Sequence, residues 1–142
     1  MSSLLSAINA SASGLDAQRA RMEVAASNLA NADSTHGPNG EPYRRREVIL
    51  EANDPGGFGA TLNRVQAAGV TVKDVVEDQS AFTKKYDPSS PDADADGYVS
   101  MPNVQVPEEM TDMLDAARAY QANLAAIGVV RDTIQKALDL AK

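Results

Sequence analysis

The stretch 106-VPEEMTDMLDAARAYQANLAAIGVVRDTIQKALDLAK-142 decides the fold, because its apolar residues recur in alternating steps of three and four. This spacing predicts one long amphipathic helix that begins near Val106. Pro107 suits the first turn of a helix, and Glu108 and Glu109 suit the positive end of its dipole. The stripe is interrupted only at Arg131 and comprises Val106, Met110, Met113, Ala117, Tyr120, Leu124, Ile127, Ile134, Leu138 and Ala141.

The N-terminal residues carry a second helical pattern, from Ser3 to about Ala32, which ends before the turn-forming residues 35–40. Arg19 falls where this pattern expects an apolar residue. We therefore expect it to extend into solvent or to pair with Asp16 or Glu23. The heptad positions are filled by Ile8, Leu15, Met22 and Leu29, with Leu5, Ala12 and Ala26 at the complementary positions.

Between the two helical patterns lie runs that are typical of β-strands. Residues 43–51 and 69–78 are rich in valine, isoleucine and leucine, and residues 97–101 suggest a third strand. Residues 53–59 and 87–91 are loops by composition. The sequence thus predicts an α+β fold, in which long N- and C-terminal helices pair as an antiparallel coiled-coil hairpin around a small β-rich middle region. The expected divisions are 1–34, 35–105 and 106–142.

Alanine lines the helix faces that lie outside these stripes. A single antiparallel helix pair buries one stripe on each helix, so we expect other helices to cover the remaining apolar faces. Two alternatives stay open: the β-region folds back over these faces, or the alanines serve only helix propensity. The alanines concerned are Ala7, Ala10, Ala17, Ala20, Ala25, Ala30, Ala116, Ala119, Ala122, Ala125 and Ala126.

Composition excludes several classes of function. The formal net charge is −7, and the basic residues form only one short run, so we predict no nucleic-acid partner. The chain has no cysteine, which removes thiolate nucleophiles, disulfides and cysteine-based metal sites. Its first residues lack the basic and apolar regions of a signal peptide, and no stretch is apolar enough to span a bilayer. We therefore expect no stable membrane insertion.

Few residues offer chemistry. Residues 92–97, DADADG, copy the start of an EF-hand loop, but Asn103 stands where calcium needs a bidentate glutamate, so an acidic turn before a short strand is the better interpretation. His36 has no second histidine or cysteine to complete a catalytic or metal set. The basic run 43–46 either grips an acidic surface or forms a solvated strand face. We predict no enzyme activity and no cofactor.

Several segments resemble the family of flagellar rod and hook proteins. Residues 12–17, ASGLDA, and 26–32, ASNLANA, are similar to a signature that these axial proteins share. A narrower resemblance, to the proximal rod members, rests on segments in the middle and C-terminal regions. These are Pro42-Tyr43-Arg44-Arg45, Tyr86-Asp87-Pro88, Pro91-Asp92-Ala93, Gly97-Tyr98-Val99, Met101-Pro102-Asn103-Val104, Glu109-Met110, Met113, Arg118-Ala119-Tyr120 and Ala122-Asn123.

The resemblance implies a structural subunit of the bacterial flagellar basal-body proximal rod, part of the drive shaft that transmits torque and lines the export path. Its partners would be other rod proteins, copies of itself and the flagellar type III export apparatus. It would reside in the rod that spans the periplasm, after export without a cleavable signal peptide. The heptads alone would also fit a non-polymerising helical-hairpin adaptor of a secretion system, and the acidic loop a calcium-regulated module.

On this interpretation the apolar heptad residues pack in the assembly, and three asparagines fix the register of the helices, although asparagine near a helix end is as readily a simple cap. The expected packing residues are Ile8, Leu15, Met22, Leu29, Met113, Tyr120, Leu124, Ile127 and Ile134, and the expected register residues are Asn28, Asn31 and Asn123.

Overall fold

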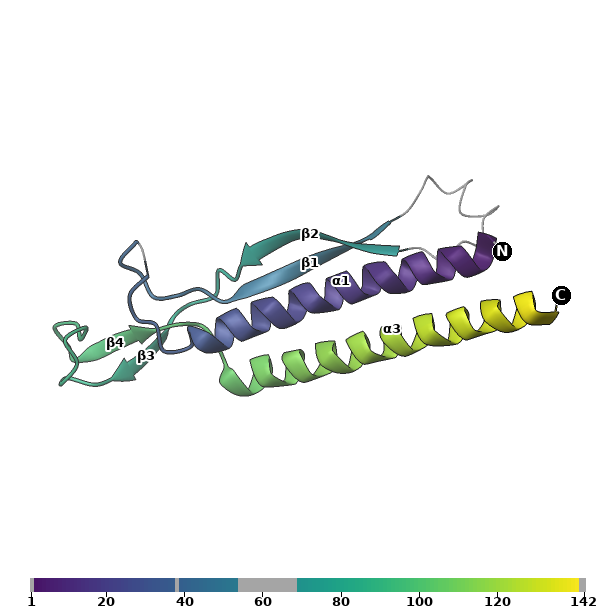
Figure 1. Cartoon of the computed structure of the whole chain (residues 1–142). Helices are drawn as coiled ribbons and strands as arrows, with labels where there is room; N and C mark the ends of the chain where they lie inside the picture. Colours follow the sequence, from purple (N-terminus) through teal and green to yellow (C-terminus); the bar gives the residue numbers. More distant parts are fainter. Residues whose placement is uncertain (1, 38, 54–68, 141–142) are drawn as a thin grey trace.

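The computed structural model describes residues 2–37, 39–53 and 69–140. Two long helices lie side by side and antiparallel, with both chain termini at one end of an elongated molecule (Figure 1). The elements in chain order are α1 (Ser2–Ala30), β1 (Arg46–Asn53), β2 (Gly69–Glu77), β3 (Thr83–Tyr86), β4 (Tyr98–Met101) and α3 (Val106–Leu140).

The bounds of both helices follow the signals in the sequence. α1 ends at Ala30, where the Asn31 N–H and the Asn31 side-chain amide both donate to the carbonyl oxygen of Ser27, at 3.1 and 2.8 Å. α3 begins at Val106, as predicted, and its first turn is closed by the Glu109 N–H, which donates to the Gln105 carbonyl oxygen at 3.1 Å. Its 35 residues give a rod of roughly 50 Å.

The middle region forms two separate two-stranded antiparallel sheets. β1 and β2 pair from Arg46 opposite Glu77 to Asn53 opposite Gly69, with a bulge on β2 where Lys73 has no partner. This hairpin lies along α1 on the side away from α3 (Figure 1). The predicted loop at residues 53–59 falls almost entirely outside the described residues.

β3 and β4 form a short hairpin beyond the ends of the helices, far from both termini (Figure 1). β4 confirms the third predicted strand, whereas β3 was not predicted. Its four residues, TKKY, are all exposed, so the run carries no alternating apolar pattern. Pairing with β4 and the edge-on contact between the Tyr86 and Tyr98 rings, 5.3 Å apart, hold it in place.

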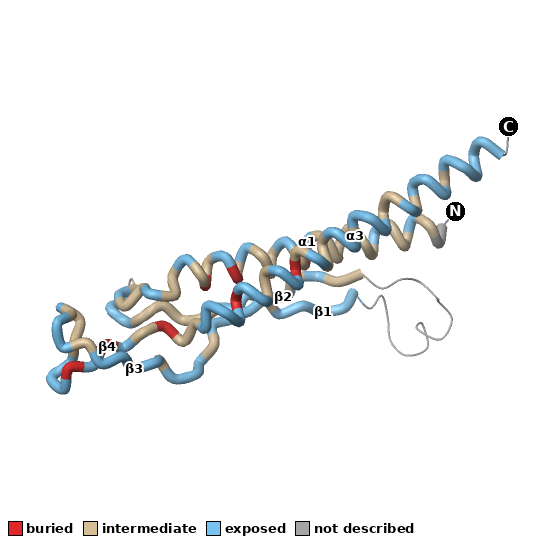
Figure 2. Tube along the Cα trace, turned by 90° about the horizontal axis from the view of Figure 1, so that it is seen from below, coloured by how far each residue is buried: buried red, intermediate tan, exposed pale blue. Residues whose placement is uncertain are grey.

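The interior is made of small side chains, and few segments are fully buried (Figure 2). Ala17, Ala25 and Ala116 are buried within the chain, because α1 lies between α3 and the β1–β2 hairpin. The expectation that these alanines need other subunits to cover them is therefore wrong. For α1, the alternative of a β-region that folds back over the helix describes the structure.

Candidate functional site

Asn28, near the C-terminal end of α1, is the buried amide around which the site is built; 1% of it is exposed. The Arg46 N–H donates to Asn28 Oδ1 at 3.0 Å, and Asn28 Nδ2 donates to the Arg46 carbonyl oxygen at 2.9 Å. The Tyr43 hydroxyl donates to the same Oδ1 at 2.9 Å. Since the amide bonds both backbone groups of Arg46, as a residue of a neighbouring strand would, Asn28 fixes the start of β1 on α1.

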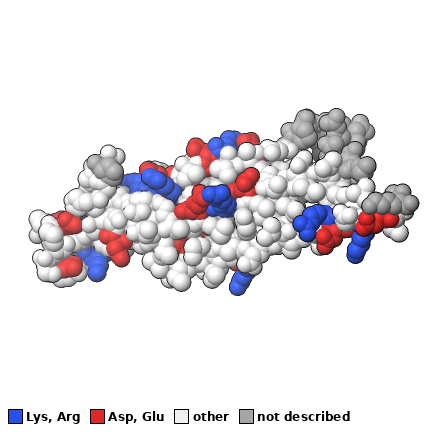
Figure 3. Space-filling model, in the orientation of Figure 1, with Lys and Arg blue, Asp and Glu red and all other residues white. Residues whose placement is uncertain are grey.

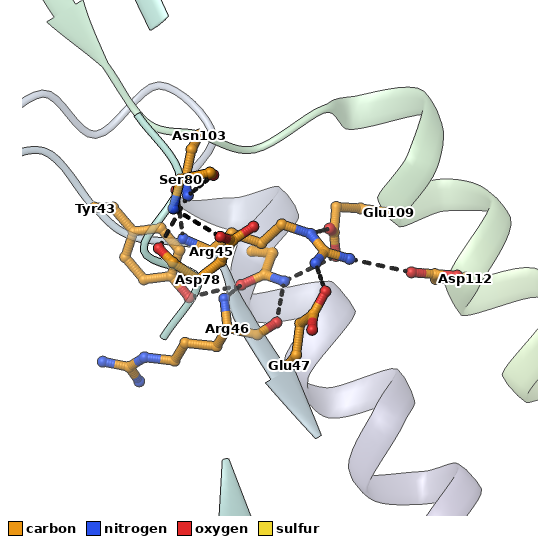
Figure 4. A network of polar contacts seen from close by, with 10 residues as sticks. Tyr43, Arg45, Arg46, Glu47, Asp78, Ser80, Asn103, Glu109 and Asp112 are labelled. Atoms are coloured by element: carbon orange, nitrogen blue, oxygen red, sulfur yellow. Dashed lines mark hydrogen bonds and ion pairs between the residues drawn. The ribbon is translucent and has the colours of Figure 1, made fainter. Parts of the chain in front are cut away.

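Glu109, in the first turn of α3, brings a carboxylate to the same point. It is 2% exposed. Its Oε2 accepts from Asn28 Nδ2 at 2.9 Å, and its Oε1 accepts from Arg45 Nε at 2.5 Å. A buried carboxylate costs several kcal/mol unless it is paired and hydrogen-bonded, so Glu109 can stay buried only while Asn28 and Arg45 keep these positions. We call Asn28, Tyr43, Arg45, Arg46 and Glu109 the polar junction. Figure 4 labels all of these residues except Asn28.

Arg45 connects the junction to two further carboxylates. Its side chain is 15% exposed, donates to Glu47 Oε1, and lies 3.4 Å from Asp112 Oδ2 on the next turn of α3 (Figure 4). Burial opposes the charged form of the guanidinium, but its hydrogen bonds to Glu109 and Glu47 outweigh that effect, so the pKa of Arg45 is raised. The residue is a permanent cation held between β1 and α3.

Asn103, just before α3, extends the network to the end of β2. Its Oδ1 accepts from the Arg45 N–H at 2.8 Å, and its Nδ2 donates to the Asp78 carbonyl oxygen at 3.1 Å and to Ser80 Oγ at 2.8 Å. Backbone and side-chain hydrogen bonds from Ser80 lower the pKa of the exposed Asp78 carboxyl. The end of β2, the start of β1 and the approach to α3 thus meet at one place.

A second contact point lies about 21 Å along α1 from Asn28, at Ser13 and Gly14. Ser13 Oγ accepts from the Val70 N–H of β2 at 3.0 Å and donates to the Ala10 carbonyl oxygen at 2.8 Å. A Cβ on Gly14 would lie 3.0 Å from Nδ2 of Asn123 on α3. These neighbouring residues therefore bring the hairpin close on one side of α1 and α3 close on the other.

The expected packing residues lie on half-buried faces, with one exception. Ile8, Leu15, Met22 and Leu29 on α1 are partly buried, as are Met113, Tyr120, Ile127 and Ile134 on α3. Leu124 is 56% exposed. Figure 1 places α1 and α3 side by side along their length, so these residues lie on neighbouring elements.

The complementary heptad positions are not where the sequence pattern suggested. On α1 this position is exposed at Leu5, Arg19 and Ala26, and only Ala12 is partly buried. The Arg19 guanidinium pairs with Glu23 at 2.9 Å, as expected for this outlying cation. On α3 Met110 is exposed whereas the preceding residue, Glu109, is buried. The inner stripe of α3 therefore alternates the predicted position 113, 120, 127, 134 with 109, 116, 123, 130.

The three expected register residues differ in what they contact. Asn28 belongs to the polar junction. Asn31 bonds only within its own helix end, including a 3.3 Å contact from the Ser34 hydroxyl to its Oδ1. Asn123 donates to the Ala119 carbonyl oxygen at 3.1 Å and packs beside Gly14.

The acidic loop and the histidine are occupied by contacts within the chain, some local and some between distant segments. Asp94 Oδ1 accepts from the N–H groups of Asp96 and Tyr98, at 3.0 and 2.8 Å, which closes the turn before β4. Asp92 Oδ2 accepts from the Thr35 hydroxyl at 2.7 Å and lies 3.4 Å from His36 Nδ1. Among residues 2–37, 39–53 and 69–140, no three histidine, cysteine or acidic side chains are grouped so that they could hold a metal ion.

Sequence reasoning missed the two ions of the junction. It assigned Glu109 to the helix dipole and left Arg45 open between a solvated face and an acidic surface; the acidic surface is that of α3 itself. One signal was available, because Glu109 lies seven residues before Ala116 and fourteen before Asn123, in a stripe of small and polar residues.

Large apolar side chains lie on the outside of α3. Most of the helix is exposed along its outer side (Figure 2). On the face shown in Figure 3, charges of both signs are intermixed. In the part of the chain that the structure describes, neither helix combines the length and apolar character needed to cross a bilayer. The exposed apolar residues of α3 are Val106, Met110, Leu114, Leu124, Val129, Leu138 and Leu140.

Comparison with known proteins gives consistent matches at both ends of the chain. The family model described as flagella basal body rod protein matches residues 8–38, and that described as flagellar basal body rod FlgEFG protein C-terminal matches residues 95–140. The flagellar basal-body rod protein FlgC of Escherichia coli O157:H7 is 44% identical over 137 residues, which cover 96% of this chain and 97% of that protein. The protein of the same name from Bacillus subtilis is 43% identical, over 95% of this chain and 96% of that protein. The one from Agrobacterium fabrum is 40% identical, over 100% of this chain and 98% of that protein.

Proposed function

The chain belongs to the FlgC family of flagellar basal-body rod proteins, and we propose that it enters the rod through exposed apolar side chains on its long helices. It is a structural subunit of the flagellar basal body. One observation carries the proposal: the fully buried apolar residues of the helices are small, and several large apolar residues of α3 are exposed. Ala116 is fully buried, whereas Leu114 and Leu124 on the same helix are 54% and 56% exposed.

This placement of small side chains inside and large apolar side chains on the surface favours an assembled subunit over a free monomer. Fully burying a leucine or methionine side chain contributes about 1.5–3 kcal/mol, and the outer side of α3 forgoes part of this at several half-exposed residues in the isolated chain. Helices of neighbouring subunits are suitable partners, since an apolar helix face is best covered by another helix. Contacts of this head-to-tail kind, which do not close into a ring, generate helical tubes.

The family and these faces support a finer role. The chain serves in the proximal part of the rod, where many interlocked helices transmit torque and surround the export path. Its partners are other rod proteins and copies of itself, and the type III export apparatus delivers it to the periplasm-spanning rod. The work is mechanical and needs no catalytic group or cofactor.

Within the subunit, residues 1–34 and 106–142, which include α1 and α3, act as the axial part, and residues 35–105 act as the outward-facing part. We further propose that the two helices wind into a coiled coil in the rod. Its seam on α3 combines large and small residues in steps of three and four, which supports this geometry. The seam residues are Glu109, Met113, Ala116, Tyr120, Asn123, Ile127, Val130 and Ile134.

Substitution of Leu124 by glutamate tests the proposal. Because Leu124 is exposed, Leu124→Glu is expected to keep the helical content of the isolated chain and to abolish rod assembly and motility when it replaces the normal protein in cells. Ala125→Glu is the matched control, with the same new charge one residue later, on the exposed face of α3 that carries Arg118 and Asp132. Normal rods built from the Leu124→Glu chain would contradict the assembly face. A chain that never enters rods, whatever its sequence, would instead favour the adaptor.

A further inference from the structure

The apolar contacts between α1 and α3 discriminate poorly between registers. The fully buried apolar residues on these helices are alanines, which have little shape to interlock. Large residues recur every seven positions at Met113, Tyr120 and Ile127. A shift of α3 by one heptad, about 10 Å, would therefore place similar side chains in similar surroundings.

The polar junction has no such periodicity. Glu109 is the one buried carboxylate among the residues that the structure describes. In the same part of the chain, every buried side-chain nitrogen and oxygen atom has a hydrogen-bond partner. A heptad shift would bring Ala116 opposite Asn28 or would carry Glu109 beyond it, and both leave buried polar groups unpaired.

We infer that the Asn28–Glu109–Arg45 cluster positions α3 against α1, so that these three residues select one register among those that the small-residue seam allows. Buried polar groups at single positions are known to specify register in helix pairs, at some cost in stability. Arg45 acts through Glu109: it neutralises the carboxylate that Asn28 then fixes in place, at 2.5 and 2.9 Å.

The consequence for assembly rests on the proposed function. A shifted α3 would carry its outer apolar residues about 10 Å along the rod axis relative to α1. The outer faces of α1 and α3 would then be offset from each other, and a neighbouring subunit could not contact both of them as it does in the normal register. The register itself, however, is a property of the single chain and can be measured without a rod.

Disulfide cross-linking can report the register, because the natural chain has no cysteine. The reporter Gly14→Cys is combined with Asn123→Cys for the observed register, or with Ala116→Cys or Val130→Cys for the two shifted ones. Gly14 and Asn123 are in contact, and residues 116 and 130 are each about 10 Å further along α3, beyond the reach of a disulfide. The unaltered junction should therefore give only the 14–123 product.

The test variant is the pair Arg45→Met and Glu109→Leu, which removes both buried charges together. We expect the shifted products to rise at least about tenfold, which corresponds to a register preference of about 1.4 kcal/mol. Arg44→Met with Glu108→Leu is the matched control: it makes the same chemical changes one residue away on each segment and should leave the shifted products unchanged. A test variant that gives only the 14–123 product overturns the inference.

Glu109→Gln provides the measurement if the double variant loses its helical circular dichroism. The amide keeps the shape of the side chain but removes the charge that Arg45 holds. The shifted products should again rise, and their absence in a folded Glu109→Gln chain overturns the inference. Motility of cells that carry each variant is scored separately. A negative cross-linking result would contradict the register inference without contradicting the proposed rod function, and a negative motility result would leave the cross-linking result valid.

Discussion

Replacing Asn28 by alanine should destabilise the chain more than truncating any other uncharged polar side chain of α1. The change removes four hydrogen bonds: two with the Arg46 backbone, one with Glu109 and one with the Tyr43 hydroxyl. It also leaves the Glu109 carboxylate with Arg45 as its remaining partner. No charge is added or removed, so the effect isolates the hydrogen bonds of the amide.

The magnitude follows from how well each abandoned group can reach water. Glu109 is 2% exposed, so its unpaired oxygen should account for about 1–3 kcal/mol. The Arg46 and Tyr43 groups are partly exposed and can be hydrated, and each should lose a net hydrogen-bond contribution of about 0.5–1 kcal/mol. We expect a loss of about 3 kcal/mol in the free energy of unfolding, a large part of the 5–15 kcal/mol of an ordinary domain.

Urea unfolding of the isolated chain, followed by far-ultraviolet circular dichroism, measures this loss. Asn31→Ala is the matched control, because Asn31 bonds only at its own helix end and should lose about 1 kcal/mol or less. If Asn28→Ala and Asn31→Ala differ by less than about 0.5 kcal/mol, the junction does not hold the elements together as its geometry indicates.

Three further changes test separate contacts. Gly14→Ala should gain little in stability, since its new Cβ meets the Asn123 amide at 3.0 Å, but combined with Asn123→Ala it should stabilise the chain by about 1 kcal/mol through helix propensity in urea unfolding. Ser80→Ala should raise the pKa of Asp78 in a carboxyl NMR titration. Because the pKa of Asp78 is lowered in the folded chain, its contact with Ser80 stabilises the fold at pH values above the ordinary carboxyl pKa. This stabilisation is lost as the pH falls through the lowered pKa. Arg19→Ala should leave Tm unchanged within error in a thermal scan, because its ion pair is fully solvated.

The ends of the elements could be predicted well where backbone chemistry determines them. Pro107 marks the start of α3, and the turn formers after Asn31 mark the end of α1. β1 begins three residues later than predicted, at Arg46, because Tyr43 and Arg45 turn toward the helices. The β-favouring residues that predicted the strand, Val48, Ile49 and Leu50, lie further along and gave no sign of this.

The sequence predicted only one of the two heptad positions that α3 turns toward α1. An apolar stripe identifies a buried face when large residues point inward, and here Leu124 and Met110 point outward while Ala116 is buried. A second layer also contacts α1, which broadens its covered face beyond one heptad stripe. Arg19 was the visible signal that one assumed inner position faces solvent.

The polar junction could not be predicted from spacing, because it joins residues that are far apart in the sequence. Asn28 and Glu109 are separated by 81 positions, and Arg45 and Glu109 by 64. The seven-residue spacing of Glu109, Ala116 and Asn123 marks one face of α3 but does not identify the residues that meet it, and each member of the ion pair has an ordinary local role available. Only the three-dimensional meeting of α1, β1 and α3 distinguishes a buried Glu109 from the exposed Glu108 beside it.

Small and polar residues have different roles in the contact between α1 and α3, which explains how the chain can hold one helix register and still leave an apolar surface for neighbouring subunits. Fully buried alanines let the helices approach closely, while several large side chains of α3 stay outside for neighbours. Such a seam is tolerant of sliding, and sliding would displace the outer faces of the two helices against each other. A fully bonded ionic cluster at one end of the seam removes that freedom while leaving the outer apolar surface unchanged. On this argument the cluster is retained for specificity more than for stability, and replacing it by apolar residues of similar volume should preserve folding while degrading assembly.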